Sequence, residues 1–182
     1  MGTPASQRTV QTLVDEHYVA LYRYAYRLTG STSDAEDLTQ DAFCKAQLNF
    51  AQLRDAGRAK PWLFSILRNG YLHRVRSRKQ EACLSLDDVG DLPELPADPL
   101  PEIDPEQLQQ VLNELSEVFR TPLILYYFED FSYRDIAEQM DLPLGTVMSR
   151  LARAKAYLRS HLLPRGTVAV NGQRPGRATD GL

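Results

Sequence analysis

The sequence predicts an all-α protein of two small helical domains, the second containing a helix-turn-helix, joined by a flexible acidic, proline-rich linker. Three observations support this prediction. Apolar residues recur every three or four positions through most of the chain, which is the spacing of one helix face. The segment from Leu84 to Asp104 is acidic and contains four prolines, so it should stay extended and divide the chain. A short helical pattern and a basic one meet at Asp141-Leu142-Pro143, as in a helix-turn-helix.

Charge is strongly segregated along the 182 residues, although the net charge is only −3. Residues 58–79 contain seven Lys or Arg and no acid, whereas residues 81–106 contain nine Asp or Glu and no base. Because the local field governs binding to nucleic acid, the near-neutral total does not exclude it. No apolar run is long enough to span a bilayer, and the N-terminus lacks a signal-peptide core. We therefore expect a cytoplasmic protein with no membrane insertion.

The first predicted helix covers residues 9–29, where apolar positions recur at helical spacing. Gly30 is expected to end it, because glycine readily adopts the left-handed conformation that follows many helices. Ser33 with Glu36 resembles a capping box, which predicts that a second helix begins at about Asp34 and runs to about Asn49.

The second predicted helix has two unlike faces. Its apolar side consists of Ala35, Leu38, Ala42 and Ala46, and its polar side of Asp34, Asp37 and Asp41 with Glu36 and Gln40 beside them. Acids in the first turn favour the helix dipole, but Asp41 lies too far along the helix for that effect. Two interpretations stay open, a docking surface for a basic partner and a plain solvated face.

A loop over residues 53–60 leads to a third predicted helix, from about Pro61 to Gln80, whose first turn accommodates the proline. The end of this helix is densely basic, with Arg74, Arg76, Arg78 and Lys79. Bases at a helix C-terminus gain from the dipole, which is the plain explanation. Their density, together with the bases of the loop, favours a nucleic-acid surface that contacts phosphates and stacks unpaired bases.

The second half is expected to begin with an amphipathic helix opened by Asp104 or Pro105. Thr121-Pro122 is expected to start the next helix, and the apolar run LILYYF that follows should be buried. The linker is either a solvated tether or, because it is anionic, a mimic of nucleic acid. The predicted division is a first domain at 9–82, a linker at 83–104, a helix-turn-helix domain at 105–163 and a disordered tail at 164–182.

The helix-turn-helix pattern covers residues 128–160. Ser132 with Asp135 resembles a capping box that starts its first helix, and Pro143 suits the first turn of the second. The second helix places Val147, Leu151, Ala154 and Leu158 on one stripe, and Thr146, Ser149, Arg150 and Arg153 on the opposite one. A basic second helix with a small polar face suits DNA reading, and an ordinary helical hairpin is the alternative.

No catalytic pattern is present in the sequence. It has no glycine-rich phosphate loop, no HExxH and no GxSxG, and its three histidines are scattered. The acids of residues 34–41 could in principle bind Mg²⁺, but no base or nucleophile accompanies them. Cys44 and Cys83 form no CxxC pair, so idle or buried thiols are expected. We expect a protein that is not an enzyme and has no cofactor and no metal.

Three motifs together resemble the small two-domain bacterial RNA polymerase sigma factors of the extracytoplasmic-function (ECF) group. They are SDAEDLTQDAF at 33–43, PWLFSILRN at 61–69 and YRDIAEQMDLPLGTVMSRLARAKAYLR at 133–159. The similarity extends over about residues 9–162. It implies a sigma factor that initiates transcription by reading the −35 element and opening the strands at the −10 element.

The resemblance also implies a role for each surface. Core RNA polymerase would bind Asp34, Glu36, Asp37, Gln40 and Asp41. The −10 DNA strand would be held by Arg58, Ala59, Lys60, Trp62, Arg68, Asn69, Arg74, Arg76, Arg78 and Lys79, with a flipped base gripped by the loop. The −35 element would be read by Thr146, Ser149, Arg150, Arg153 and Lys155. Promoter DNA and core polymerase are thus the expected partners, together with an anti-sigma factor.

The chain departs from the family pattern before the tryptophan, where Pro61 stands in place of the Ser or Thr of many relatives. The preceding loop, LRDAGRAKP, is also individual, so the base preferred at the −10 element does not follow from the resemblance. A helix-turn-helix regulator that binds an operator is the rival interpretation. It would need a dimer and would not explain the acids at 34–41.

Overall fold

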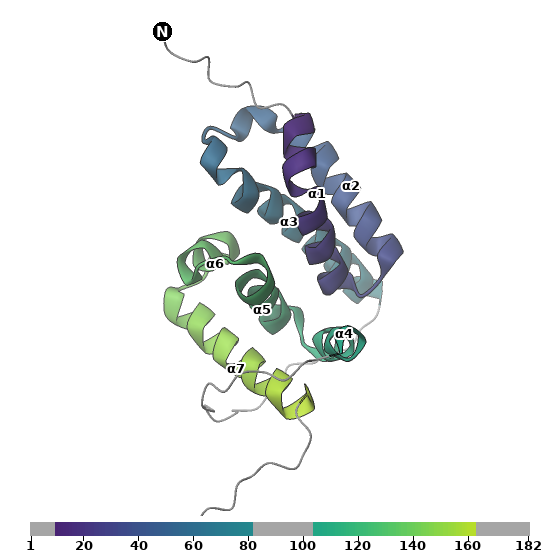
Figure 1. The fold of residues 1–182 in the computed structure, drawn as a ribbon, viewed down its shortest axis with the longest axis vertical. Helices are drawn as coiled ribbons and strands as arrows, with labels where there is room; N and C mark the ends of the chain where they lie inside the picture. Colours follow the sequence, from purple (N-terminus) through teal and green to yellow (C-terminus); the bar gives the residue numbers. More distant parts are fainter. Residues whose placement is uncertain (1–9, 82–103, 163–182) are drawn as a thin grey trace, which may run out of the picture.

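The computed structural model describes residues 10–81 and 104–162, and within these ranges it is entirely helical (Figure 1). The first half contains three α-helices and two 3-10 turns, α1 (Val10–Thr29), α2 (Thr32–Leu48), η1 (Phe50–Gln52), η2 (Ala56–Arg58) and α3 (Ala59–Glu81). The second half contains α4 (Pro105–Glu114), α5 (Glu117–Glu129), α6 (Tyr133–Met140) and α7 (Leu144–Leu162). The predicted linker up to residue 103 and the predicted tail lie outside the described residues.

The turn between α1 and α2 is shorter than the sequence pattern predicts. Gly30 ends α1 as expected, with a φ of 68° and its N–H donating to Tyr26 at 2.7 Å. The prediction that Ser33 caps α2 is wrong, because Ser31 is the capping residue and its hydroxyl accepts from the Asp34 N–H. The chain leaves Gly30 directly into the extended conformation that a cap requires, so α2 begins two residues earlier.

Prolines occupy two different helical environments. Pro61 is the third residue of α3, within the first turn, where its missing N–H has no helical partner to lose. The prediction that Pro122 starts a helix is wrong, since it lies inside α5. The helix break falls earlier, at Leu115 and Ser116, which both have extended backbones. The ring of Pro122 is buried. The free energy gained by this burial offsets the cost of the backbone hydrogen bond that proline cannot make.

The helix-turn-helix of α6 and α7 follows the sequence pattern closely. Ser132 and Asp135 form the predicted capping box, each side chain accepting from the other residue's backbone N–H. Asp141 ends α6 in the left-handed conformation, with a φ of 53°, and turns the chain into α7. The predicted apolar stripe of α7 is confirmed, because Val147, Leu151, Ala154 and Leu158 are all buried.

The two halves pack directly against each other and share one hydrophobic core. Helix α1 contacts α4 and α5, and α3 contacts α6, as the two groups of helices in Figure 1 indicate. At the centre, the ring of Phe64 lies 4.9 Å from Tyr24 of its own half and 5.2 Å from Phe131 of the second half. Among the described helices, none is long and apolar enough to cross a membrane.

Candidate polymerase and nucleic-acid interfaces

The acidic face of α2 is open to solvent. Its apolar side packs into the core, which turns the opposite side outward. Glu36, Asp37, Gln40 and Asp41 are exposed, and Asp34 in the first turn is half-buried. Carboxylates on adjacent turns of one exposed helix face form a surface that attracts a basic partner.

An ion pair joins the acidic face to the basic end of α3. Arg74 donates from its guanidinium to the Asp41 carboxylate, and both side chains are partly exposed. The structure therefore brings together two residues that the sequence assigned to different partners, Asp41 to polymerase and Arg74 to DNA. The two predicted surfaces are neighbours on this half of the molecule.

The residues predicted to hold the −10 strand differ in exposure. Arg58, Asn69 and Arg76 are exposed, while Lys60, Trp62, Arg68 and Arg74 are half-buried. Ala59 is only 1% exposed, so in this conformation its methyl group packs in the core and is not presented to a base. The side chains of Arg78 and Lys79 lie outside the described residues.

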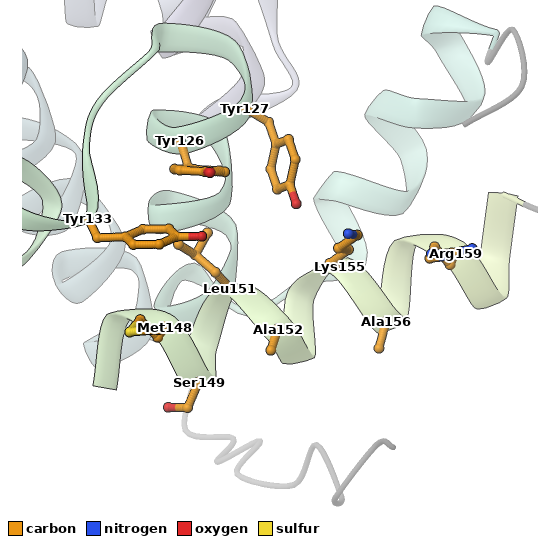
Figure 2. Close-up of a pocket in the computed structure, with 10 residues that line it drawn as sticks. All are labelled: Tyr126, Tyr127, Tyr133, Met148, Ser149, Leu151, Ala152, Lys155, Ala156 and Arg159. Carbon is orange, nitrogen blue, oxygen red and sulfur yellow. The ribbon is translucent and has the colours of Figure 1, made fainter. Parts of the chain in front are cut away.

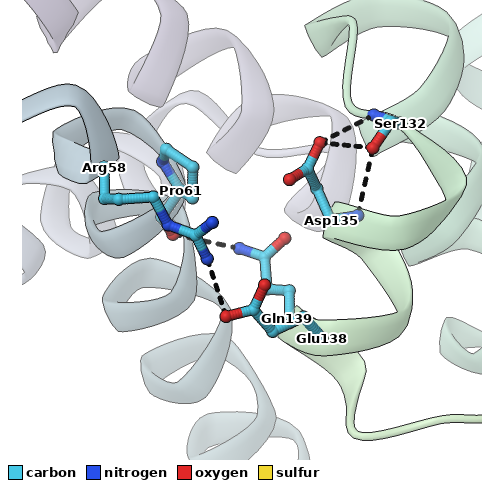
Figure 3. Close-up of polar contacts among 6 residues, drawn as sticks. All are labelled: Arg58, Pro61, Ser132, Asp135, Glu138 and Gln139. Atoms are coloured by element: carbon cyan, nitrogen blue, oxygen red, sulfur yellow. Dashed lines mark hydrogen bonds and ion pairs between the residues drawn. The ribbon is translucent and has the colours of Figure 1, made fainter.

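Three of these basic side chains reach across to the second half. A nitrogen of Arg58 lies 2.6 Å from a carboxylate oxygen of Glu138, as Figure 3 shows. Lys60 donates to the backbone carbonyl of Glu129 at 2.6 Å, and Arg68 donates to that of Gln139 at 3.2 Å. The end of α5 and the outer side of α6 therefore cover the loop and the first turns of α3.

Aromatic rings and a small groove surround these contacts. The Lys60 ammonium lies 5.2 Å from the centre of the Phe131 ring and 5.7 Å from that of Phe64, within the range of cation–π attraction. A groove of about 420 Å³ lies between the halves and is lined by Leu53, Arg58, Pro61, Trp62, Glu138 and Gln139, among others. Its walls come from both halves, so it exists only while they are packed together.

Glu129 is a carboxylate buried between the halves and only 5% exposed. Burial raises its pKa to about 7, and the nearby charges of Arg27, Lys60 and Arg23 oppose that shift without cancelling it. The closest of these partners is Arg27, with 3.8 Å between a guanidinium nitrogen and a carboxylate oxygen. Asp130, the next residue, adds a small effect in the same direction as burial. Sequence reasoning did not single out Glu129, because only packing removes it from water.

The raised pKa of Glu129 predicts that the packed structure loses stability as the pH rises from about 5 to about 7. The ordinary pKa of this carboxyl is 4.5, so only well below that pH is it protonated in both the packed and the unfolded chain, and above about pH 7 the packed structure must bury a charge. Glu129→Gln keeps a neutral group at this buried position. The stability of the variant relative to the native chain should therefore increase as the pH rises from about 5 to about 7. Urea unfolding at several pH values measures this, with the exposed Glu106→Gln as the matched control. If the free energies of unfolding of Glu129→Gln and the native chain differed by the same amount at every pH, the prediction would be contradicted.

The polar face of α7 is accessible. Ser149 and Arg153 are exposed, and Thr146, Arg150 and Lys155 are half-buried. The opposite stripe of α7 is anchored in the core, which holds this face outward. Hydroxyl and guanidinium groups of this kind can donate hydrogen bonds to base edges and phosphates in a major groove.

A groove of about 530 Å³ runs beside this face, with three tyrosines on one wall (Figure 2). The tyrosines are Tyr126, Tyr127 and Tyr133, and the other wall includes Met148, Ser149, Ala152 and Lys155 of α7. The prediction that the whole run LILYYF is buried is wrong, because Tyr127 is 44% exposed. Around the helix axis Tyr127 lies between Leu123 and Ile124, but it is near the C-terminal end of α5, beside the groove. Helical spacing gave no signal for this exposure, because it places Tyr127 on the same face as two fully buried residues.

Within the described ranges, His, Cys, Asp and Glu side chains form no group of three or more that could hold a metal ion. The described residues present one acidic surface, on α2, and two basic or polar surfaces, on α3 and α7.

Comparison with known proteins identifies both halves. The family model for Sigma-70 region 2 matches residues 13–81, and that for Sigma-70, region 4 matches residues 105–158. The ECF RNA polymerase sigma factor SigE of Mycolicibacterium smegmatis is 35% identical over 171 residues, covering 88% of this chain and 64% of SigE. The ECF sigma factor SigL of Mycobacterium tuberculosis is 32% identical over 158 residues, covering 85% of this chain and 89% of SigL.

A solved structure shows the same helical arrangement. The sigma factor RpoE of Bartonella quintana, crystallised in complex with the anti-sigma factor NepR, matches with a TM-score of 0.69 at 29% identity. The match covers 84% of this chain and 95% of RpoE. These likenesses extend across both halves, and the chain therefore belongs to the ECF RNA polymerase sigma factors, which are not enzymes and which direct RNA polymerase to promoters.

Proposed function

We propose that this sigma factor docks on core RNA polymerase through the acidic face of α2. The observation that carries the proposal is the row formed by Glu36, Asp37, Gln40 and Asp41, which is exposed while the apolar side of α2 packs against α1 and α3. An exposed row of one sign favours a basic partner by steering and by complementarity. Asp34 lies at the edge of this surface. Because RNA polymerase acts on the chromosome, this role places the chain in the cytoplasm.

The loop before α3 and the α3 helix itself are proposed to hold the unpaired strand of the −10 element. Lys60, Arg68 and Arg74 provide cations for phosphates, and Trp62 provides a ring for stacking. Arg58, Asn69 and Arg76 extend the same surface into solvent. Strand separation costs stacking energy, which phosphate contacts, base capture and polymerase contacts must together offset.

Helix α7 is proposed to read the −35 element in the major groove. Its polar face carries Ser149 and Arg153, which are exposed, and Arg150, which is half-buried. Two further half-buried residues, Thr146 and Lys155, flank them. The tyrosine-lined groove gives Tyr127 and Tyr133 access to the same DNA, where their hydroxyl groups can reach phosphates. The acidic linker, residues 83–103 of which lie outside the described part, would run toward the RNA exit path.

A regulatory partner is also proposed. RpoE, which shares the fold at 29% identity, is seen with the anti-sigma factor NepR. An anti-sigma factor that grips both halves of this chain would compete with polymerase and with promoter DNA together.

Reconstituted transcription tests the proposed function. Purified chain and core RNA polymerase are combined on genomic DNA of the encoding organism, and the expected result is transcripts that start at a defined set of promoters. On such a promoter, the chain without polymerase should bind duplex DNA weakly, because each small domain offers few contacts and tethering to polymerase supplies the effective concentration. Nanomolar binding of the promoter by the chain alone in a gel shift would contradict this division of labour.

A further inference from the structure

The outward side of α7 differs from the polar face that the sequence spacing predicts. Of the five residues predicted to read the −35 element, only Ser149 and Arg153 are exposed, and the other three are half-buried. Two residues outside that prediction, Met148 and Ala152, are exposed as well, and Met148 is 51% accessible. The strip that α7 exposes around Ser149 is therefore partly apolar.

Helical geometry accounts for the composition of this strip. Residues three and four positions apart share one face of a helix, and Gly145, Met148, Ser149 and Ala152 follow that spacing. All four are exposed, because the buried stripe of α7, which includes Val147, packs into the core on the other side of the helix. If α7 lies in a major groove, this strip faces the bases.

We propose that Met148, with Ala152 one turn later, recognises thymine in the −35 element through the C5-methyl group of the base. The inference rests on the proposed function, since it takes α7 as the helix that reads the major groove. Thymine is the one standard base that presents a methyl group there. An apolar side chain gains free energy by covering that methyl group, and it has no such contact with the other bases.

The side chain of Met148 is suited to this contact. Methionine is unbranched and polarisable, so it can adapt to an apolar group in a groove of irregular shape. Half of its surface is open to water in the free chain, and contact with a base would bury this apolar area. Met148 and Ala152 both line the tyrosine-lined groove, with Tyr133 on its other wall (Figure 2).

The polar neighbour on the same strip offers little competition for this role. The hydroxyl of Ser149 donates to the backbone carbonyl of Thr146 at 3.0 Å, so its proton is engaged within α7. Between Gly145 and Ala152 the exposed strip thus presents apolar groups and one accepting oxygen. Apolar contact is therefore the main means by which this part of α7 can distinguish one base from another.

Gly145 allows the beginning of α7 to approach DNA closely. It is exposed, and a Cβ atom at this position would meet no atom of the chain within 4 Å. Packing within the protein therefore does not require glycine here, although glycine is a poor helix former. The bare backbone leaves space for the DNA, which brings Met148, three residues later, nearer to the base edges.

Four variants isolate the contribution of the side chain. Met148→Ala shortens it, Met148→Gln keeps its length and makes its end polar, and Met148→Leu keeps it apolar. Because Met148 is exposed, none of these changes should disturb the core. Val19→Ala removes an apolar side chain that is 59% exposed on α1, in the other half of the chain, and is the control.

The DNA is varied by one methyl group at a time. Each thymine of the −35 element, on either strand, is replaced in turn by uracil, which lacks only the methyl group. Holoenzyme is reconstituted from the full chain and core polymerase, and its dissociation constant is measured for duplex promoters under conditions that keep the strands paired. The promoters are those found in the transcription experiment.

Uracil at one or more positions of the −35 element should weaken binding of the native holoenzyme about fourfold, since covering a methyl group contributes about as much as burying one CH₂. At these positions Met148→Ala and Met148→Gln should bind thymine and uracil duplexes almost equally. Met148→Leu and Val19→Ala should keep most of the loss. The proposal would be overturned if uracil had no effect on the native holoenzyme, if Met148→Ala kept the full loss, or if the −35 elements contained only G·C pairs.

Failure of this proposal is distinguishable from failure of the proposed function. Selectivity between an intact and a scrambled −35 element, measured for Arg150→Ala combined with Arg153→Ala, tests whether α7 reads DNA. If this double variant lost its selectivity while uracil had no effect on the native holoenzyme, the methyl contact alone would be overturned. If the double variant kept its selectivity and uracil again had no effect, reading of the −35 element by α7 would be overturned as well.

Discussion

Reversing the charge of Asp37 and Asp41 to Lys is expected to abolish binding of core RNA polymerase. Both carboxylates are exposed on one face of α2, one turn apart, so neither substitution should disturb the core. The variant replaces two attractions with two like-charge contacts, which cost several kcal/mol and correspond to a loss of about 100-fold or more. Binding to immobilised core polymerase measures the effect directly.

A matched variant separates docking from net charge. Asp15→Lys with Glu106→Lys makes the same total change at exposed positions on α1 and α4, away from the acidic face. It should bind polymerase as the native chain does. Arg74→Ala removes the ion pair that Asp41 makes within the chain and should also leave docking intact. If the variant with Lys at Asp37 and Asp41 bound polymerase as tightly as the variant with Lys at Asp15 and Glu106, the assignment of the α2 face would be refuted.

Replacing Arg150 and Arg153 with Ala is expected to remove the preference of the holoenzyme for its −35 element. A well-placed arginine discriminates between base pairs by about 1–3 kcal/mol, so the pair should account for tenfold or greater selectivity. The stripe of α7 that packs in the core contains neither residue, so the helix should remain folded. The measurement compares holoenzyme binding to promoters with an intact or a scrambled −35 element.

Arg134→Ala provides the control for this variant. Arg134 is exposed on α6, the first helix of the motif, which in this class of fold crosses the DNA backbone. Loss of this side chain should weaken holoenzyme binding to both promoters to the same degree, because phosphate contacts carry no sequence information. If the Arg150 and Arg153 variant kept full discrimination between the two promoters, α7 would not be the reading helix.

Local signals in the sequence were reliable where neighbours in the chain decide the structure. The capping box of Ser132 and Asp135 and the break at Asp141 depend on groups within a few residues, and both predictions are confirmed. The start of α2 was missed because Ser31 and Ser33 are both capable caps, and the turn after Gly30 selects between them. The prediction that Pro122 starts a helix also failed because of its surroundings. Burial of the ring within the core overrides the preference of proline for the first turn of a helix.

The exposure of single residues was harder to predict. The acids of α2 share a face by helical geometry alone, so sequence spacing was enough to group them. Tyr127 lies in a run of six apolar and aromatic residues, and only the orientation of α5 within the core turns it toward the groove. Glu129 looks like an ordinary helix-terminal acid until packing buries it and raises its pKa to about 7.

The sequence by itself determined the helical class, the helix-turn-helix, the acidic and basic surfaces and the family, because helix periodicity, caps and motif spacing are encoded between near neighbours. Only the tertiary structure decided that the two halves share a core and that α5 and α6 cover Arg58, Lys60 and Arg68. The Arg58–Glu138 contact joins residues 80 positions apart. The pairing of such surfaces depends on shape and desolvation across the whole fold, and no spacing along the chain specifies it.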